Sequence, residues 1–241
     1  MKGIILSGGQ ATRLWPCTKV TSKQLLPVYN RPMIYYPLNT LIKAGIKEIL
    51  IIVAPEQAGD YLKLLGSGKE FGVKFTYEIQ DKPKGLADAF IIGENFIDED
   101  NVTMILGDNI FEDDLSAEIK SFKAGAKIFA KPVPDPERFG IVEVDERGRA
   151  VSIEEKPKQP KSNLCITGLY IYDSRVVAAA KQVKPSARGE IEITDLHNWY
   201  LAKGELEVAM VKGEWIDAGT FDSLLAAQIL SKEKLQDKLI I

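Results

Sequence analysis

The pattern of apolar and polar residues along the first half of the chain switches repeatedly between strand-like and helix-like spacing. Four short, nearly continuous apolar runs are typical of strands buried on both faces, and they span residues 3–7, 47–55, 73–81 and 101–109. Three segments with apolar residues at helical spacing lie between them, at 31–46, 56–68 and 85–97. Pro37 lies inside the first of these segments, so this helix is expected to bend or to begin late. The alternation predicts a Rossmann-like α/β fold, in which helices cover both faces of a mostly parallel central sheet.

The second half of the chain is richer in strands and follows the first half without a Ser/Gly/Pro-rich linker. Residues 127–160 show strand-like alternation with turn signals and no clear helix. Further on, the pattern predicts a strand at 164–173, helices at 176–183, 189–204 and 220–236, and one or two strands within 205–219. We therefore expect one structural unit over residues 1–241, with two halves of about 1–130 and 131–241.

Composition and charge narrow the class of protein. The chain has 241 residues, of which 45% are hydrophobic and 27% charged, with a net charge of −3, so a general nucleic-acid binder is not expected. Cys17 and Cys165 are far apart and form no CxxC pair, which favours a reducing compartment. Because the sequence contains neither a long apolar run nor a signal-peptide pattern, we expect no membrane span and a cytoplasmic location.

The apolar run that ends at Ser7 leads directly into a glycine-rich loop that contains cations but no acidic residue. Gly8 and Gly9 allow close approach of a ligand to backbone N–H groups, and Arg13 and Lys23 add positive charge. This combination favours a phosphate site, although neither the P-loop pattern nor GxGxxG is present. From these residues alone, a glycine turn with a solvated basic flank remains the alternative.

The stretch GGQATRLWPCTKVTSKQLLPV, which contains this loop, resembles the signature of the sugar-nucleotide pyrophosphorylases, a family of nucleotidyltransferases. Later blocks resemble the same family in the same order, and they are RPMIYYPLNTL, GLADAFIIGENFI, LGDNIF, DPERFGIVE, EEKPKQPKSN, TGLYIYD and KPSARGEIEITD. The resemblance covers nearly the whole chain. It implies the nucleotide-diphospho-sugar transferase fold, with a nucleotide-binding first half and a sugar-phosphate-binding second half.

The implied reaction joins a nucleoside triphosphate to a sugar 1-phosphate and releases pyrophosphate. Within the family, the branch that uses dTTP and glucose 1-phosphate is the most similar, and use of UTP is the enzymatic alternative. A non-catalytic sugar-nucleotide sensor of the same fold is the alternative from another class. It would be expected to lack a loop cation or a metal carboxylate, whereas this chain has all the corresponding residues.

The chemistry needs positioning, positive charge and a metal rather than a general base, because the attacking phosphate is already an anion. A chain with a single histidine fits this requirement. The resemblance implies Arg13, Lys23 and Lys156 as catalytic cations and Mg²⁺ as the cofactor, held by Asp108 and Asp217. Without the resemblance, a turn or helix cap would be the favoured interpretation of each of these aspartates.

The resemblance also implies the residues that bind each substrate. The expected nucleotide-binding residues are Leu6, Gly8, Gly9, Ala11, Thr12, Arg13, Lys23, Gln80, Gly85 and Asp108. The expected sugar-binding residues are Leu86, Asn109, Gly140, Glu155, Lys156, Ile166, Tyr170 and Trp215. Gln80 can donate to and accept from the thymine edge, whereas Arg138 is expected to be a surface charge and His197 a structural residue.

Two features depart from the family pattern. Ala11 replaces a usual glycine, so its backbone must adopt a negative φ or accept strain. The chain also resembles a short form, because long relatives continue beyond its last residue. Family members are commonly homotetramers, and we therefore expect a homo-oligomer. The resemblance does not decide whether the allosteric control and subunit packing of the long forms apply to this chain.

Overall fold

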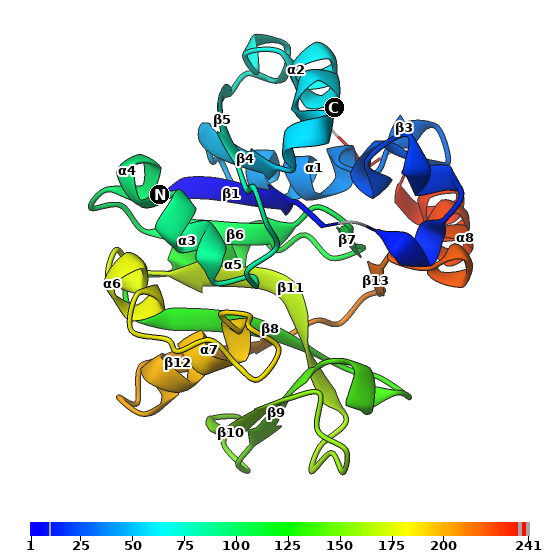
Figure 1. Ribbon diagram of the computed structural model, residues 1–241. Coiled ribbons are helices and arrows are strands. Elements are labelled where there is room, and N and C mark those ends of the chain that lie inside the picture. Colours follow the sequence, from blue (N-terminus) through cyan, green and yellow to red (C-terminus); the bar gives the residue numbers. More distant parts are fainter. Residues whose placement is uncertain (10, 236–237, 240–241) are drawn as a thin grey trace.

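The computed structural model describes residues 1–9, 11–235 and 238–239. Its first half contains the predicted alternation of strands and helices (Figure 1). The strands are β1 (Lys2–Ser7), β2 (Pro27–Val28), β3 (Arg31–Pro32), β4 (Glu48–Val53), β5 (Lys74–Ile79), β6 (Val102–Leu106) and β7 (Asn109–Phe111). The helices are α1 (Tyr35–Lys43), α2 (Ala58–Leu65), α3 (Asp88–Ile92), α4 (Glu94–Ile97) and α5 (Ser116–Ser121).

The second half is dominated by strands, as the sequence predicts. These strands are β8 (Ala126–Pro132), β9 (Gly140–Val144), β10 (Ala150–Glu155), β11 (Leu164–Tyr172), β12 (Leu206–Met210) and β13 (Trp215–Asp217). The helices are α6 (Val176–Ala180), α7 (Ile193–Leu201) and α8 (Phe221–Leu230), the last continuing into a π-helical turn at Ser231–Leu235. Among the described residues, no helix is long and apolar enough to span a membrane.

One sheet runs through both halves, in the order β10-β9-β11-β6-β1-β4-β5, with β8 paired to β11 and β12 paired to β8. Strands β6, β1, β4 and β5 are parallel, as predicted, whereas β11 is antiparallel to both β6 and β8. A small antiparallel pair of β7 and β13 adds a second link between the halves.

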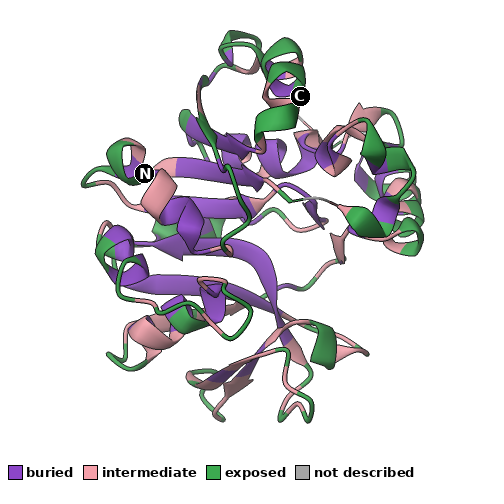
Figure 2. Ribbon diagram, viewed as in Figure 1, coloured by how far each residue is buried: buried purple, intermediate pink, exposed green. Residues whose placement is uncertain are grey.

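The core lies on both faces of this sheet, and Figure 2 shows the central strands buried beneath more exposed helices. Ile4 and Ile5 are neighbours on β1, but they belong to different hydrophobic clusters because alternate side chains point to opposite faces. Both side chains are fully buried. The nearly continuous apolar runs of the sequence therefore report burial of the strands on two faces.

Two of the predicted helices differ from the structure, for local reasons. The single helix expected at 85–97 is interrupted at Gly93, where a Cβ would lie 3.0 Å from Cδ2 of Leu50 on the sheet below. The helix expected from 189 begins at Ile193, because Ser186 and Arg188 bond to Glu192 and hold the preceding residues in a turn. The short helix α5 was not predicted.

Candidate active site

Two cavities adjoin at the carboxyl ends of β1, β5 and β6, where ligands bind in sheets of this kind. The nucleotide-side cavity has a volume of about 200 Å³ and is lined by the glycine-rich loop and the end of β5. The acceptor cavity has a volume of about 360 Å³ and lies between the two halves. Leu86, Leu106 and Glu190 line both cavities, so the two cavities are direct neighbours.

The predicted site residues divide between these two cavities, and Arg13, which the resemblance implies as a nucleotide-binding residue, lines the acceptor cavity. The nucleotide-side cavity is lined by Leu6, Gly8, Gly9, Lys23, Gln80, Gly85 and Asp108. The acceptor cavity is lined by Leu86, Asn109, Gly140, Glu155, Lys156, Ile166, Tyr170 and Trp215, together with Arg13 and Asp217. Ala11 and Thr12 line neither cavity, and they lie in the loop segment between Gly9 and Arg13.

Ala11 adopts the left-handed backbone conformation that the missing glycine would favour. Its φ is 46° and its ψ is 38°, so it accepts the strain rather than avoiding it. The hydroxyl of Thr18 donates to the Ala11 carbonyl at 2.8 Å, which helps to hold the loop in this shape. Lys156 also has a positive φ, of 44°, so two of the predicted site residues carry unusual backbone conformations.

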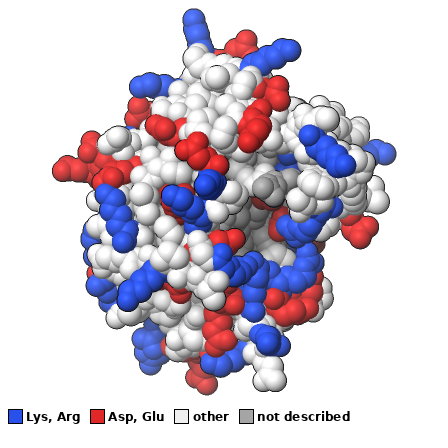
Figure 3. Space-filling view, viewed as in Figure 1, with Lys and Arg blue, Asp and Glu red and all other residues white. Residues whose placement is uncertain are grey.

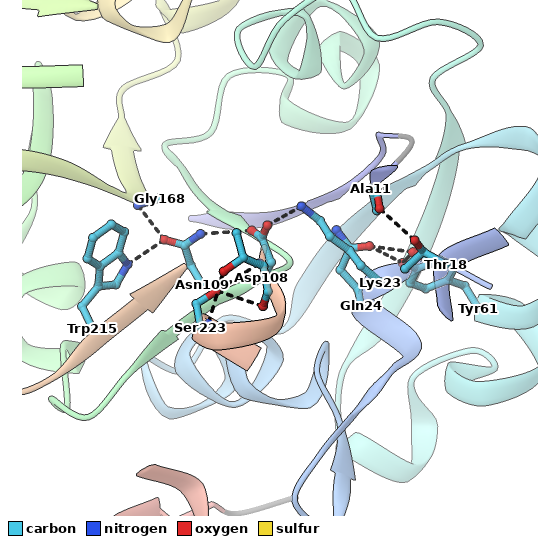
Figure 4. Close-up of polar contacts among 12 residues, drawn as sticks. Ala11, Thr18, Lys23, Gln24, Tyr61, Asp108, Asn109, Gly168, Trp215 and Ser223 are labelled. Atoms are coloured by element: carbon cyan, nitrogen blue, oxygen red, sulfur yellow. Dashed lines mark hydrogen bonds and ion pairs between the residues drawn. The ribbon is translucent and has the colours of Figure 1, made fainter. Parts of the chain in front are cut away.

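Lys23 and Asp108 form a buried ion pair at the junction of the cavities (Figure 4). Burial lowers the pKa of Lys23 and Asp108 raises it, and the carboxylate prevails, so the pKa lies above its ordinary value. For Asp108, burial raises the pKa while Lys23 lowers it, and the ammonium prevails. The lysine therefore carries its positive charge and the aspartate its negative charge at neutral pH.

Asp217 is held beside Asp108 by the pairing of β13 with β7. Asp217 lies opposite Asn109 in the strand register, and the N–H of Ala218 donates to the carbonyl of Asp108 at 2.9 Å. Burial, followed by the negative charge of Asp108, raises the pKa of Asp217 to about 7. Within the described residues, Oδ1 of Asp217 is buried and has no hydrogen-bond partner.

Arg13 approaches this acidic pair across Gly219. A Cβ on Gly219 would lie 2.8 Å from Nη2 of Arg13 and 2.9 Å from Oδ1 of Asp217. The absence of a side chain at Gly219 therefore leaves room for both the Arg13 guanidinium and the Asp217 carboxylate. As Figure 3 shows, basic side chains gather around the hollow on this face of the molecule.

Asn109 connects three parts of the site. Its Oδ1 accepts from the N–H of Gly168 at 2.9 Å and from Nε1 of Trp215 at 2.7 Å, and its Nδ2 donates to Asp108 at 3.1 Å (Figure 4). A Cβ on Gly168 would lie only 2.5 Å from this oxygen, so the contact requires glycine there. The amide oxygen accepts two hydrogen bonds within the protein and one amide N–H is donated to Asp108, so only the second N–H of Asn109 remains available to a sugar.

Charged side chains at the far end of the acceptor cavity share one carboxylate. Oε1 of Glu155 lies 3.3 Å from Nζ of Lys156 and 3.4 Å from Nη2 of Arg188. Arg188 also contacts Glu192 at 2.9 Å. Because both cations remain about half exposed, they can contact a bound anion without losing Glu155.

Gln24 and Gln80 face the nucleotide-side cavity with their amides held by protein groups behind them. Ser22 donates to Oε1 of Gln24 at 2.6 Å, and the Tyr61 hydroxyl lies 2.7 Å from the same serine. Nε2 of Gln80 donates to Asp88 at 3.0 Å. Gln80 was predicted both to donate to and to accept from the thymine edge. Because one of its amide N–H groups is bonded to Asp88, only the other N–H and the amide oxygen remain available to a base.

Comparison with known proteins agrees with this arrangement. The Nucleotidyl transferase family profile matches residues 2–234. The chain belongs to the nucleotidyl transferase family. It is 56% identical over 230 residues to a glucose-1-phosphate thymidylyltransferase of Neisseria meningitidis, an alignment that spans 93% of this chain and 80% of that protein. An enzyme of the same name from Mycolicibacterium smegmatis is 51% identical over 232 residues, spanning 94% of this chain and 81% of that protein.

Solved structures of nucleotidyl transferases have the same fold. A Bacillus anthracis crystal structure, described as a glucose-1-phosphate thymidylyltransferase in complex with sucrose, has a TM-score of 0.92 and 50% identity. It covers 97% of this chain and 96% of its own chain. A UDP-glucose pyrophosphorylase complexed with UDP-glucose has a TM-score of 0.82, but at 24% identity it bears on the fold alone.

Some residues of this nucleotidyl transferase site were missed from the sequence. Arg188 and Glu192 line the acceptor cavity, and the block KPSARGEIEITD, which resembles the family, contained the signal for them. Arg138 is exposed, as expected of a surface charge, and it also lines the same cavity. Gln24 follows Lys23 in the signature and could have been found there, whereas its partner Tyr61 carries no sequence signal.

Proposed function

We propose that this protein transfers a thymidylyl group from dTTP to α-D-glucose 1-phosphate, giving dTDP-glucose and pyrophosphate. The observation that carries the proposal is the pair of adjoining cavities with Lys23, Asp108, Asp217 and Arg13 at their junction. Relatives at 51–56% identity bear the name of this activity, and they are similar over most of their length.

The reaction follows from the charges at this junction. A phosphate oxygen of glucose 1-phosphate attacks the α-phosphorus of dTTP, while the bond from that phosphorus to the pyrophosphate oxygen breaks. Two anions must approach each other, so positive charge is needed more than proton transfer. Arg13 stabilises the leaving pyrophosphate, Lys23 contacts the α-phosphate, and Lys156, with Arg188 beside it, holds the sugar phosphate.

The same proposal includes Mg²⁺, held by Asp108 and Asp217. The fit rests on the buried, unpartnered Oδ1 of Asp217 next to a second carboxylate. Among the described residues, no third His, Cys, Asp or Glu joins them, so phosphates and water must complete the coordination, as is usual for Mg²⁺. When bound, the ion would neutralise charge on the reacting phosphates.

Recognition of the two substrates is assigned to the cavity walls. Gln80 and the backbone at Gly8 and Gly85 read the thymine edge. Glu155 accepts hydrogen bonds from sugar hydroxyls, and Tyr170 and Trp215 form apolar walls. UTP remains the alternative nucleotide, because the thymine methyl group contributes little discrimination.

We also propose that the two halves act as one unit, since β11 pairs directly with β6. A cytoplasmic homo-oligomer is proposed, with a tetramer as the first assembly to test. The support for self-association is helix α8, whose Phe221, Leu225 and Ile229 are 49%, 58% and 49% exposed. These residues are spaced to share one face of the helix.

A matrix of pyrophosphate release tests the function. dTTP, UTP, dCTP, ATP and GTP are each combined with glucose, galactose and mannose 1-phosphates, with and without Mg²⁺. We expect the highest kcat/KM for dTTP with glucose 1-phosphate and a requirement for Mg²⁺. Release that is absent for every pair would refute the proposed activity, and turnover undiminished without a divalent ion would refute the role of the metal.

A further inference from the structure

Gln80 lies in the nucleotide-side cavity, and its amide has two ends with opposite hydrogen-bonding character. The oxygen can only accept and the nitrogen can only donate. Whichever end faces the nucleotide therefore decides which base edge can pair with it. Thymine presents an N–H donor at N3, whereas cytosine presents an acceptor at the same position.

Asp88, which lies behind Gln80 and outside the cavity lining, fixes this orientation. Nε2 of Gln80 donates to Oδ2 of Asp88 at 3.0 Å, and both side chains are only 8% exposed. A carboxylate oxygen accepts from an amide N–H but would repel the amide oxygen. Turning the amide around would therefore place two acceptors against each other in a buried environment.

The amide oxygen of Gln80, at the opposite end from the nitrogen that bonds Asp88, points toward the glycine-rich loop. A Cβ built on Gly8 would lie 2.9 Å from Oε1 of Gln80, so this oxygen faces the backbone of residue 8. Gly8 and Gln80 both line the nucleotide-side cavity. The amide oxygen is thus directed to a place where a base can reach it.

The position of Asp88 is itself fixed by the backbone around it. Ile191 donates its N–H to the carbonyl of Lys84 at 2.7 Å and accepts from the N–H of Ala87 at 3.2 Å. Gly85 has a φ of 101° and passes so close to Ile191 that a Cβ would lie 2.3 Å from its carbonyl oxygen. Asp88 begins α3 directly after this anchored turn, so its carboxylate cannot easily move away from Gln80.

We propose that Asp88 is a positioning residue that sets base specificity, because it holds Gln80 with the amide oxygen toward the nucleotide and so selects bases with an N3–H donor. Thymine and uracil satisfy this requirement, whereas cytosine does not. This inference rests on the proposed function, since it concerns the nucleotide used in that reaction.

The test compares Asp88→Asn with the unaltered protein, using dTTP, dUTP and dCTP with glucose 1-phosphate. Asparagine is the same size but can accept or donate, so both orientations of Gln80 become possible. We expect the ratio of kcat/KM for dTTP to that for dCTP to fall by roughly tenfold or more. The ratio for dTTP to dUTP should stay unchanged, because these bases share the same edge.

Glu94→Gln is the matched control, because Glu94 is an exposed carboxylate on the next helix whose partner is Lys181. It should leave both ratios unchanged. An Asp88→Asn variant that folds and keeps the original dTTP to dCTP ratio would overturn the inference, even if overall activity falls. If the unaltered protein does not use dTTP at all, it is the proposed function that fails.

Should Asp88→Asn fail to fold, the unaltered protein still provides a test. Neutron diffraction from crystals in D₂O with dTTP distinguishes the amide oxygen from the deuterated nitrogen of Gln80. We expect the nitrogen on Asp88 and the oxygen within hydrogen-bond distance of thymine N3. The reverse orientation would overturn the inference.

Discussion

At the scale of single residues, the junction of the two cavities combines a buried ion pair with a second carboxylate. Lys23 offsets the charge of Asp108, and the side chains of Arg13 and Asp217 both lie against Gly219. Nearly balanced charge of this kind can be buried without a metal, while the unpartnered oxygen of Asp217 leaves capacity for one. The reaction adds further negative charge at this point, and so each of these groups should matter for turnover.

Replacing Asp108 with asparagine is predicted to lower kcat by roughly 10² or more, as expected for the loss of one preorganised electrostatic group. Steady-state pyrophosphate release measures the effect, and circular dichroism checks that the variant is folded. Asp60→Asn, on the exposed part of α2, serves as the control and should retain normal turnover. Turnover near the normal value in Asp108→Asn would remove this carboxylate from the mechanism.

His197 is fully buried between Tyr170 and Tyr172, and burial lowers its pKa to about 3. The complete burial places this side chain in the core, and within the described residues neither ring nitrogen has a hydrogen-bond partner. In the unfolded chain its pKa is about 6.5, so between pH 6.5 and 3 the unfolded state binds one more proton. This histidine therefore makes folding less favourable as the pH falls through that range.

Urea unfolding at several pH values tests this prediction with His197→Phe. The free energy of unfolding of the unaltered protein should fall by about 1.4 kcal/mol per pH unit more steeply than that of the variant, between about pH 6 and 4. Above pH 7 the two slopes should be equal. Parallel curves over the whole range would mean that His197 is not buried in its neutral form.

The sequence allowed prediction of those site residues that lie in contiguous motifs, such as Lys23, Asp108 and Lys156. Each stands in a short block whose spacing is set by a strand end or a tight loop. Asp88 and Tyr61 could not be predicted, because they act through side chains that only the packing of α2 and α3 brings behind Gln24 and Gln80. Their residue types are ordinary for helices, and nothing in the local pattern marks them.

At the scale of elements, the entry to α3 is fixed to the second half of the chain through Gly85 and Ile191. A Cβ on Gly85 would meet the backbone of Ile191 on three atoms, at 2.3 Å, 2.6 Å and 2.8 Å. The close approach to Ile191 alone requires glycine at position 85, whether or not a ligand is bound. A side chain would disturb the protein as well as the base pocket.

Gly85→Ala is predicted to lower the free energy of unfolding by about 2 kcal/mol or more, because it combines a steric clash with an unfavourable φ. Gly72→Ala is the matched control, since Gly72 also has a positive φ, of 68°, but no atom within 4 Å of its Cβ position. It should cost only about 1 kcal/mol. Equal losses in chemical denaturation would show that the contact with Ile191 is unimportant.

Elements with strong apolar periodicity were predicted well, as in β1, β4, β6 and β11. The late start of α1 at Tyr35 was also anticipated from Pro37, which lies in the first turn. The break at Gly93 and the late start of α7 could not be read from the pattern. They depend on the approach of a helix to the sheet and on side-chain bonds to Glu192, both of which are tertiary contacts.

At the scale of the whole molecule, strand pairing helps to bring the halves together around the site. Strand β11 of the second half pairs antiparallel with β6 and so extends the parallel sheet of the first half. Strand β13 pairs with β7. The pairing of β13 with β7 places Asp217 beside Asp108, although the two residues are far apart in the chain. The parallel arrangement followed from the sequence, but the pairing of β7 with β13 did not, because both strands are only three residues long.

Helix α8 is apolar on nearly all sides, and one side packs on the cluster that includes Met33 and Leu230. Helices of this kind are normally covered on every side. Leu225→Glu, on the uncovered side, should therefore shift the protein toward the monomer in analytical ultracentrifugation. Leu62→Glu, at a leucine that is 50% exposed on α2, is the control and should leave the assembly unchanged. A sedimentation coefficient unaltered by Leu225→Glu would exclude this helix from the interface.

The most direct test of the central claim is a crystal structure of the protein with dTTP. We predict that the triphosphate lies along the loop of residues 8–23, with Arg13 and Lys23 on its oxygens and the thymine N3 facing Oε1 of Gln80. A triphosphate bound away from this loop would contradict the assignment of the two cavities and the mechanism that depends on them.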